Sequence, residues 1–340
     1  MAHFEILVVN LEGYGKGGLG TLAYHLHESL LEAHISSVLI ASGNPKKLPN
    51  VLTLDENDYK PVPHTIEKLS TRYRVILGRN ELATLSPYLS DLILITGGTA
   101  YLQEWQDRYP HKTTLDFLRL KNLPRKLESP RIRRERLALD KATKILSAPG
   151  LNSRVLRRIY PEFTHKIFEV PQIFRRFESH RPWESREIDL IAVAQWTDRG
   201  VDRRVKGYRL LARTVDLLSR KGLQIVVVGE VPFPIEGVIH TGWIDHQETL
   251  KLIENTRVFI CPSRSECYSQ AVVEALQLGC NVVISRNAEP HGFCHPELIA
   301  SYGEGSFSQK IEKALTRKFP IKPLPLPKDS LDLLMSALRT

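Results

Sequence analysis

Short apolar runs alternate with helical or polar stretches along most of the chain. The first run, FEILVVN at 4–10, precedes a glycine-rich turn, a helical pattern over 19–33 and a second run, ISSVLIAS. Near-continuous runs rich in valine and isoleucine are typical of strands buried on both faces of a parallel sheet. We therefore predict a doubly wound α/β fold for the first half. Its other strand-like runs lie near 74–78, 91–98, 144–150 and 166–172.

The second half repeats this alternation after a polar stretch, 174–187, that we interpret as a linker. Strand-like runs lie at 188–195, 223–230, 257–263 and 281–285, with helical patterns at 207–220, 247–254 and 269–278. We predict two Rossmann-like domains, 1–175 and 176–325, whose ligand-binding strand ends face each other across a cleft. A final helix within 326–340 is predicted to pack back on the first domain.

The size and composition agree with two soluble domains. The chain has 340 residues, 42% of them hydrophobic, and no apolar run long enough to span a membrane. Its start, MAHFEILVVN, lacks the basic and apolar segments of a secretion signal, so we expect a cytoplasmic protein. The cysteine spacing does not resemble a zinc site, and we expect buried free thiols. The cysteines are Cys261, Cys267, Cys280 and Cys294.

The net charge of +9 is concentrated in one stretch of the first half. Residues 119–144 contain ten Lys or Arg against three acidic residues. Such a patch could hold the protein at an anionic membrane surface, as a peripheral protein of the inner membrane face, or could be a solvated helix. The stretch has no interleaved aromatic residues, so we expect no nucleic-acid partner.

A literal GxGxxG occurs between the first strand and the first helix, at 15–20. It would indicate a dinucleotide site if an acidic residue followed the second strand to hold the ribose, but none appears before Asp55. Lys46 and Lys47 could instead face a 2′-phosphate. Three interpretations stay open: a tight turn, a contact of backbone amides with a polar ligand, and an NAD(P) site. The glycines are Gly15, Gly17 and Gly20.

The most informative segment of the second half is CPSRSECYSQAVVEALQLGC. Glu266 lies in the turn after a strand, and Glu274 lies about a turn and a half into the following helix. The amides of Tyr268, Ser269 and Gln270 at the helix start would point at an anion. A loop carboxylate, a helix carboxylate and this helix start could therefore hold sugar hydroxyls, ribose hydroxyls and a diphosphate.

Basic residues lie at the end of another strand of the second half. Arg203, Arg204 and Lys206 precede Gly207, which opens a helix. A departing nucleoside diphosphate develops negative charge, and fixed positive groups stabilise it. We interpret Lys206 as a phosphate contact because it lies where ligands bind in α/β sheets.

These motifs together resemble the retaining glycosyltransferases of family 4, which have the GT-B fold. The family signature is a glutamate, seven residues and a second glutamate followed by a small residue, matched here by Glu266 and Glu274. The resemblance implies that Glu266 contacts the donor sugar, Glu274 the ribose and Lys206 the diphosphate. It also places Gly17 and Gly18 on the first-domain face of the donor.

The resemblance implies transfer of a sugar from a UDP- or GDP-sugar to a glycan or lipid-linked acceptor, in surface polysaccharide or glycan synthesis. It further implies that anomeric configuration is retained and that no metal or other cofactor is needed. Two alternatives stay open: an NAD(P)-dependent oxidoreductase that uses the first glycine loop, and a non-catalytic relative that binds nucleotide sugar or glycan.

Overall fold

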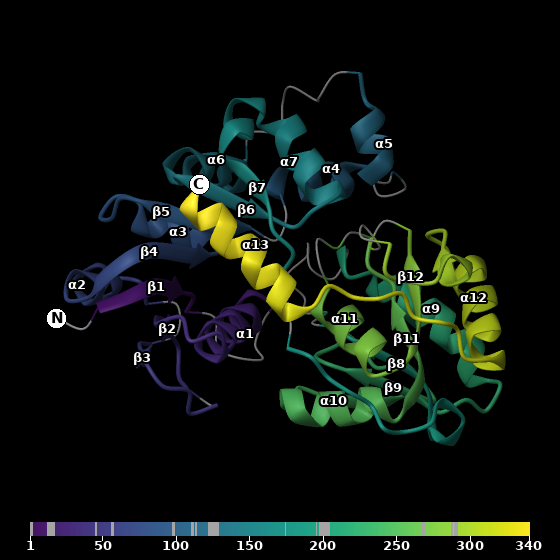
Figure 1. Cartoon of the computed structure of the whole chain (residues 1–340). Helices are drawn as coiled ribbons and strands as arrows, with labels where there is room; N and C mark the ends of the chain where they lie inside the picture. Colours follow the sequence, from purple (N-terminus) through teal and green to yellow (C-terminus); the bar gives the residue numbers. More distant parts are fainter. Residues whose placement is uncertain are drawn as a thin grey trace. The chain divides into compact units, whose positions relative to one another are not determined.

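The computed structural model divides into two compact units, each built on a parallel sheet (Figure 1). Unit 1 comprises residues 1–102, 121–175 and 325–340, and unit 2 comprises residues 103–120 and 176–324. Residues 103–120, which the sequence division placed in the first domain, thus belong to unit 2. The described residues are 3–11, 18–44, 46–55, 58–96, 99–109, 112, 114–121, 129–173, 175–194, 196, 205–264, 266, 269–286, 288 and 292–340.

Unit 1 has a seven-stranded sheet in the order β3-β2-β1-β4-β5-β6-β7, and every strand pairs in parallel with its neighbours. Alternate residues of each strand face opposite sides, so that Leu7 and Val9 pack in one core while Ile6 and Val8 pack in the other. The strands are β1 His3–Val9, β2 Ser37–Ala41, β3 Val51–Thr53, β4 Ser70–Leu77, β5 Leu92–Thr96, β6 Lys144–Ser147 and β7 Ile167–Glu169.

Helices cover both faces of this sheet. α3 and α6 contribute to the core on one face, and α1 and α13 contribute to the core on the other. The C-terminal α13 contacts α1, and Lys144 donates to the last carbonyls of α13, at Ala337 and Leu338. The helices that begin in unit 1 are α1 Gly18–Glu32, α2 Val62–Glu67, α3 Arg79–Leu85, α4 Ala100–Arg108, α6 Pro130–Lys141, α7 Leu151–Ile159 and α13 Pro327–Arg339, with the 3-10 helix η1 Pro161–Lys166.

Unit 2 has a six-stranded parallel sheet in the order β10-β9-β8-β11-β12-β13. α9 and α12 pack on one face, and α10 and α11 pack on the other. Its strands are β8 Ile188–Val193, β9 Ile225–Val228, β10 Ile239–Gly242, β11 Thr256–Cys261, β12 Asn281–Ser285 and β13 Ile299–Ala300. Its helices are α5 Thr114–Arg119, α9 Tyr208–Ser219, α10 His246–Glu254, α11 Gln270–Gln277 and α12 Glu304–Thr316, with η2 Trp183–Ser185 and η3 Pro296–Leu298.

Two parallel, doubly wound sheets confirm the predicted fold class. The linker prediction was incomplete, because part of 174–187 packs into unit 2. The guanidinium of Arg186 is buried and donates to the carbonyl oxygens of Thr256 and Leu278 at 2.8 and 2.6 Å. In the described part of the chain, no helix is long and apolar enough to cross a membrane.

One glycine of unit 2 allows two loops to touch. Gly207, the N-cap of α9, has φ 73°, and a Cβ built there would lie 2.0 Å from the carbonyl oxygen of Pro262 in the loop after β11. Beside this contact, Arg264 N donates to Val205 O at 2.7 Å. The loop after β8 and the loop after β11 are therefore in direct backbone contact, and any side chain at residue 207 would separate them.

This contact predicts that Gly207→Ala destabilises the protein much more than Gly222→Ala. Both glycines have φ 73°, so both substitutions incur the left-handed backbone penalty of about 1 kcal/mol, but nothing lies within 4 Å of a Cβ at Gly222. The steric clash at Gly207 should cost about 1–3 kcal/mol more. Urea denaturation of the two variants measures the difference. Equal losses would show that the loops are not in contact.

Candidate functional site

The candidate site lies where the strand order of unit 2 reverses direction. From β8 the chain builds β9 and β10 on one side, then returns to place β11 directly against the other side of β8. In such sheets ligands bind outside the carboxyl ends of the strands at the point of reversal. The loop after β8 carries Lys206, and the loop after β11 carries Glu266, so the two predicted residues come from the two strands at this point.

Lys206 and Glu266 form an ion pair. Lys206 Nζ lies 2.7 Å from Glu266 Oε1, and the exposed fractions of the two side chains are 35% and 11%. The backbone of Lys206 is fixed by a tryptophan. The fully buried Trp196 donates its indole N–H to the Lys206 carbonyl oxygen at 3.2 Å. An ammonium group and a carboxylate thus lie together at the carboxyl ends of β8 and β11. Both groups are partly accessible to a ligand.

Glu274 is buried on α11 and contacts a histidine. His246 Nε2 lies 2.8 Å from Glu274 Oε1, and the exposed fractions of the two side chains are 11% and 6%. His246 is the first residue of α10 and lies 28 positions from Glu274 in sequence. The sequence reasoning did not find His246, because only the packing of α10 beside α11 reveals the pair.

The start of α11 is open at its amide end. Ser269 is the N-cap, but within the described structure its side chain makes no capping hydrogen bond. One turn before Glu274 on the same helix, Gln270 has a buried Nε2 without a hydrogen-bond partner in the described part of the chain. Unsatisfied donors at a helix N-terminus are suited to an anionic ligand.

The thiol of Cys261 lies close enough to the carboxylate of Glu266 to feel its charge. Burial, together with the negative charge of Glu266, raises the pKa of Cys261 to about 12. Burial also raises the pKa of the Cys280 thiol, to about 11. Both side chains stay neutral at ordinary pH and lie in the hydrophobic core, as predicted for buried thiols.

Several predicted site residues lie outside the described residues. They are Gly17, Arg203, Arg204 and Tyr268, together with Gly15 of the glycine loop and Cys267. Gly18 is the first residue of α1 in unit 1, and Gly20 lies within that helix. The structure therefore brings together Lys206 with Glu266 and places Ser269, Gln270 and Glu274 on one helix of unit 2.

The end of β2 in unit 1 differs from that of a dinucleotide-binding site. Tyr24, which is fully buried, donates its hydroxyl to the carbonyl of Gly43 just beyond this strand, where the ribose-binding acid would be expected. Lys46, a candidate for a 2′-phosphate, instead pairs with Glu28 at 3.0 Å. The oxidoreductase interpretation therefore lacks both of its confirming groups in the described residues.

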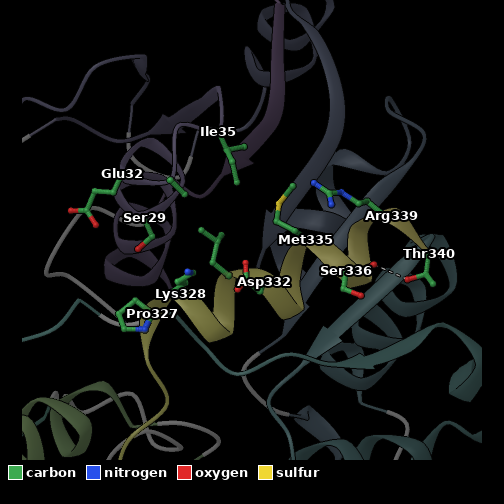
Figure 2. A pocket seen from close by; sticks show the side chains of 12 residues that line it. Ser29, Glu32, Ile35, Pro327, Lys328, Asp332, Met335, Ser336, Arg339 and Thr340 are labelled. Atoms are coloured by element: carbon green, nitrogen blue, oxygen red, sulfur yellow. Dashed lines mark hydrogen bonds between the residues drawn. The ribbon is translucent and has the colours of Figure 1, made fainter.

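A cavity of about 980 Å³ lies in unit 1. It lies between the C-terminal part of α1 and the helix α13, with Glu32, Lys328 and Asp332 at its wall and Met335 on the α13 side (Figure 2). Neither Lys206 nor the two glutamates line it. The chemistry of the candidate site is thus separate from this cavity.

The arrangement in unit 2 suits binding of a polar, anionic ligand. Lys206 and the N-terminal amides of α11 are positive groups that can face phosphate, while Glu266 and Glu274 can accept hydrogen bonds from hydroxyls. A ligand with a diphosphate between two hydroxyl-bearing groups matches this combination.

Comparisons with known proteins place the candidate site within a region that matches a known family. Residues 194–317, which include Lys206 and both glutamates, match the family model described as glycosyl transferases group 1. A search of curated proteins found no match.

Solved structures of glycosyltransferases have the same two-domain fold. The pneumococcal O-GlcNAc transferase GtfA in complex with UDP and GlcNAc aligns over 100% of this chain and 99% of its own at 10% identity, with a TM-score of 0.65. WaaG, a glycosyltransferase involved in lipopolysaccharide biosynthesis, aligns over 98% and 93% at 13% identity, with a TM-score of 0.63. Sucrose-phosphate synthase from Thermosynechococcus elongatus aligns over 98% and 95% at 13% identity, with a TM-score of 0.62.

At these identities the structures establish the fold, and the family match adds the domain that carries the candidate site. Together they support a transferase. The chain is therefore a glycosyltransferase-like protein with the GT-B fold, and its residues 194–317 match the family model of group 1 glycosyl transferases.

Proposed function

We propose that the protein is a retaining glycosyltransferase of the family 4 type, which moves a sugar from a UDP- or GDP-sugar to a glycan or lipid-linked acceptor in surface polysaccharide or glycan synthesis. The observation that carries this proposal is the meeting of Lys206 with Glu266 at the strand reversal, beside the helix that holds Glu274. GtfA, which is described with UDP and GlcNAc, and WaaG, which acts in lipopolysaccharide biosynthesis, support the substrate class by fold.

In the proposed reaction each group has a distinct role. Glu274 accepts hydrogen bonds from the ribose, and the amides of Ser269 and Gln270 face the diphosphate. Donor binding exchanges the Lys206–Glu266 pair for two new contacts, in which the ammonium faces phosphate and the carboxylate faces sugar hydroxyls. The ammonium then stabilises the charge that develops as the sugar–phosphate bond breaks.

This proposal predicts nucleotide binding that depends on Glu274. A nucleoside diphosphate at a hundred times its dissociation constant should stabilise the protein by about 2.7 kcal/mol, which a thermal-shift panel of UDP, GDP, ADP and NADPH would detect. Glu274→Ala should weaken the binding at least tenfold, because hydrogen bonds to a charged group contribute about 1.5–3 kcal/mol.

The matched control is Glu312→Ala, which removes an exposed glutamate of unit 2 that pairs with Lys221. This variant should bind like the wild type. The proposal fails if no nucleoside diphosphate binds, or if Glu274→Ala binds as well as Glu312→Ala. Binding of NADPH alone, insensitive to Glu274, would favour an oxidoreductase.

Retention and independence from metal are further parts of the proposal. Lys206 and the start of α11 supply positive charge of the kind that a metal ion can supply at a phosphate-binding site. Slow hydrolysis of the bound donor should release the sugar first as the anomer present in the donor, with an unchanged rate in EDTA. Proton NMR, recorded before mutarotation, measures both. Release of the opposite anomer, or loss of the reaction in EDTA, would contradict these two parts respectively.

We also propose that the basic stretch 119–144 holds the protein at the inner membrane face. In α6, Leu137 has an exposed fraction of 42% and lies among exposed arginines and the acidic Asp140, a mixture with a net positive charge. Arg133 and Arg134 precede Leu137 by one turn, and Lys141 follows it by one turn. An exposed apolar side chain on a helix with a net positive charge suits an anionic lipid surface.

Liposome flotation tests this placement. Each arginine near an anionic surface contributes about 1 kcal/mol, so replacing both Arg133 and Arg134 with Ala should weaken binding roughly thirtyfold at low salt. Replacing Arg213 and Arg220, exposed arginines of unit 2, is the control of equal charge change. Equal binding of the two double variants, or no binding by the wild type, would contradict a membrane role for α6.

A further inference from the structure

Among the described residues, His246 forms a close side-chain contact with the carboxylate of Glu274. Its Nε2 lies 2.8 Å from Oε1, and both side chains are almost fully buried. A buried carboxylate beside a ring nitrogen at this distance accepts a hydrogen bond, which requires the proton to be on Nε2.

The position of the histidine ring is itself fixed. Asp245, the N-cap of α10, accepts a hydrogen bond from Glu248 N at 2.9 Å, which sets the backbone at His246. The ring packs edge-on against Phe177, with a centroid separation of 6.3 Å and an interplanar angle of 81°. The donor nitrogen therefore has little freedom, and it restrains the rotation of the Glu274 carboxylate.

Carboxylate rotation matters for a ribose. The 2′- and 3′-hydroxyls of a ribose are neighbours, and one carboxylate can accept from both only when the edge that carries its two oxygens is turned toward the diol. A freely rotating carboxylate would reach one hydroxyl at a time and would distinguish ribose from deoxyribose weakly. A group that fixes this orientation thus converts a general carboxylate contact into recognition of a diol.

We propose that His246 is a positioning residue that holds Glu274 for the ribose diol and thereby sets the preference for ribonucleotides over 2′-deoxyribonucleotides. The inference rests on the proposed nucleotide-sugar function and assigns it a specificity determinant. His246 need not touch the donor, because it acts through Glu274.

The test compares the nucleoside diphosphate that binds the wild type with its 2′-deoxy counterpart, by isothermal titration. Wild type should prefer the ribonucleotide by about tenfold or more, the effect of one hydrogen bond to a charged group. His246→Asn, whose side chain is too short to reach Glu274, should lower the preference below about threefold while binding of the deoxynucleotide changes little. The side chain in His246→Gln is longer than that in His246→Asn and carries an N–H donor that can reach Glu274. This variant should therefore keep most of the preference for the ribonucleotide.

The control is His240→Ala, which removes a histidine of the same unit whose Nε2 accepts from Ile235 N instead. It should leave the preference unchanged. Equal weakening of both nucleotides in His246→Asn would show a merely structural role and overturn the inference, as would an unchanged preference. If the wild type binds no nucleoside diphosphate, the proposed function fails first, which is a distinct result.

A measurement on the unaltered protein covers the case in which the variants do not fold. Nitrogen-15 NMR of the histidine rings should show a protonated Nε2 in His246 whose chemical shift moves when the ribonucleotide is added and moves less with the deoxynucleotide. An Nε2 without a proton, or equal shifts with both nucleotides, would overturn the inference.

Discussion

The backbone contact between two loops is the constraint on which the candidate site depends. β8 and β11 are neighbours in the sheet, and the loops that follow them meet at Gly207 and Pro262. The absence of a side chain at Gly207 lets the Pro262 carbonyl approach, and the hydrogen bond from Arg264 to Val205 fixes the separation. Lys206 and Glu266 flank this contact, so their 2.7 Å pairing follows from the backbone rather than from their attraction alone.

The charged groups of the site are compensated before a ligand binds. Glu266 faces Lys206, and Glu274 faces His246, so the two buried carboxylates each have a donor. Burial of an unpaired carboxylate would cost several kcal/mol, which these partners offset. The two pairs differ in accessibility: Lys206 is partly exposed and can turn to a ligand, whereas His246 is enclosed and stays in place. The Lys206–Glu266 pair is thus suited to exchange its partners for a ligand, and the His246–Glu274 pair is suited to keep the carboxylate of Glu274 in one orientation.

The sequence predicted the central strands and the fold class well, because long apolar runs such as those of β1 and β9 are buried on both faces. It missed β3 and β10, edge strands of three and four residues whose side chains are largely exposed and leave no apolar run. It also predicted Glu266 and Glu274 as site residues, because their spacing can be read directly from one segment of the sequence. The His246 contact could not be predicted, because it depends on how α10 packs beside α11. The same holds for the clearance at Gly207, which depends on a carbonyl 55 positions away.

The central claim is that a nucleoside diphosphate binds at the β8–β11 reversal of unit 2. Hydrogen–deuterium exchange with and without saturating UDP or GDP tests it directly, because bound amides exchange more slowly. The account predicts slowed exchange in peptides that cover 205–211 and 262–276, and unchanged exchange in α12. Binding that leaves these two peptides unchanged, with protection only in the glycine loop before α1, would contradict it.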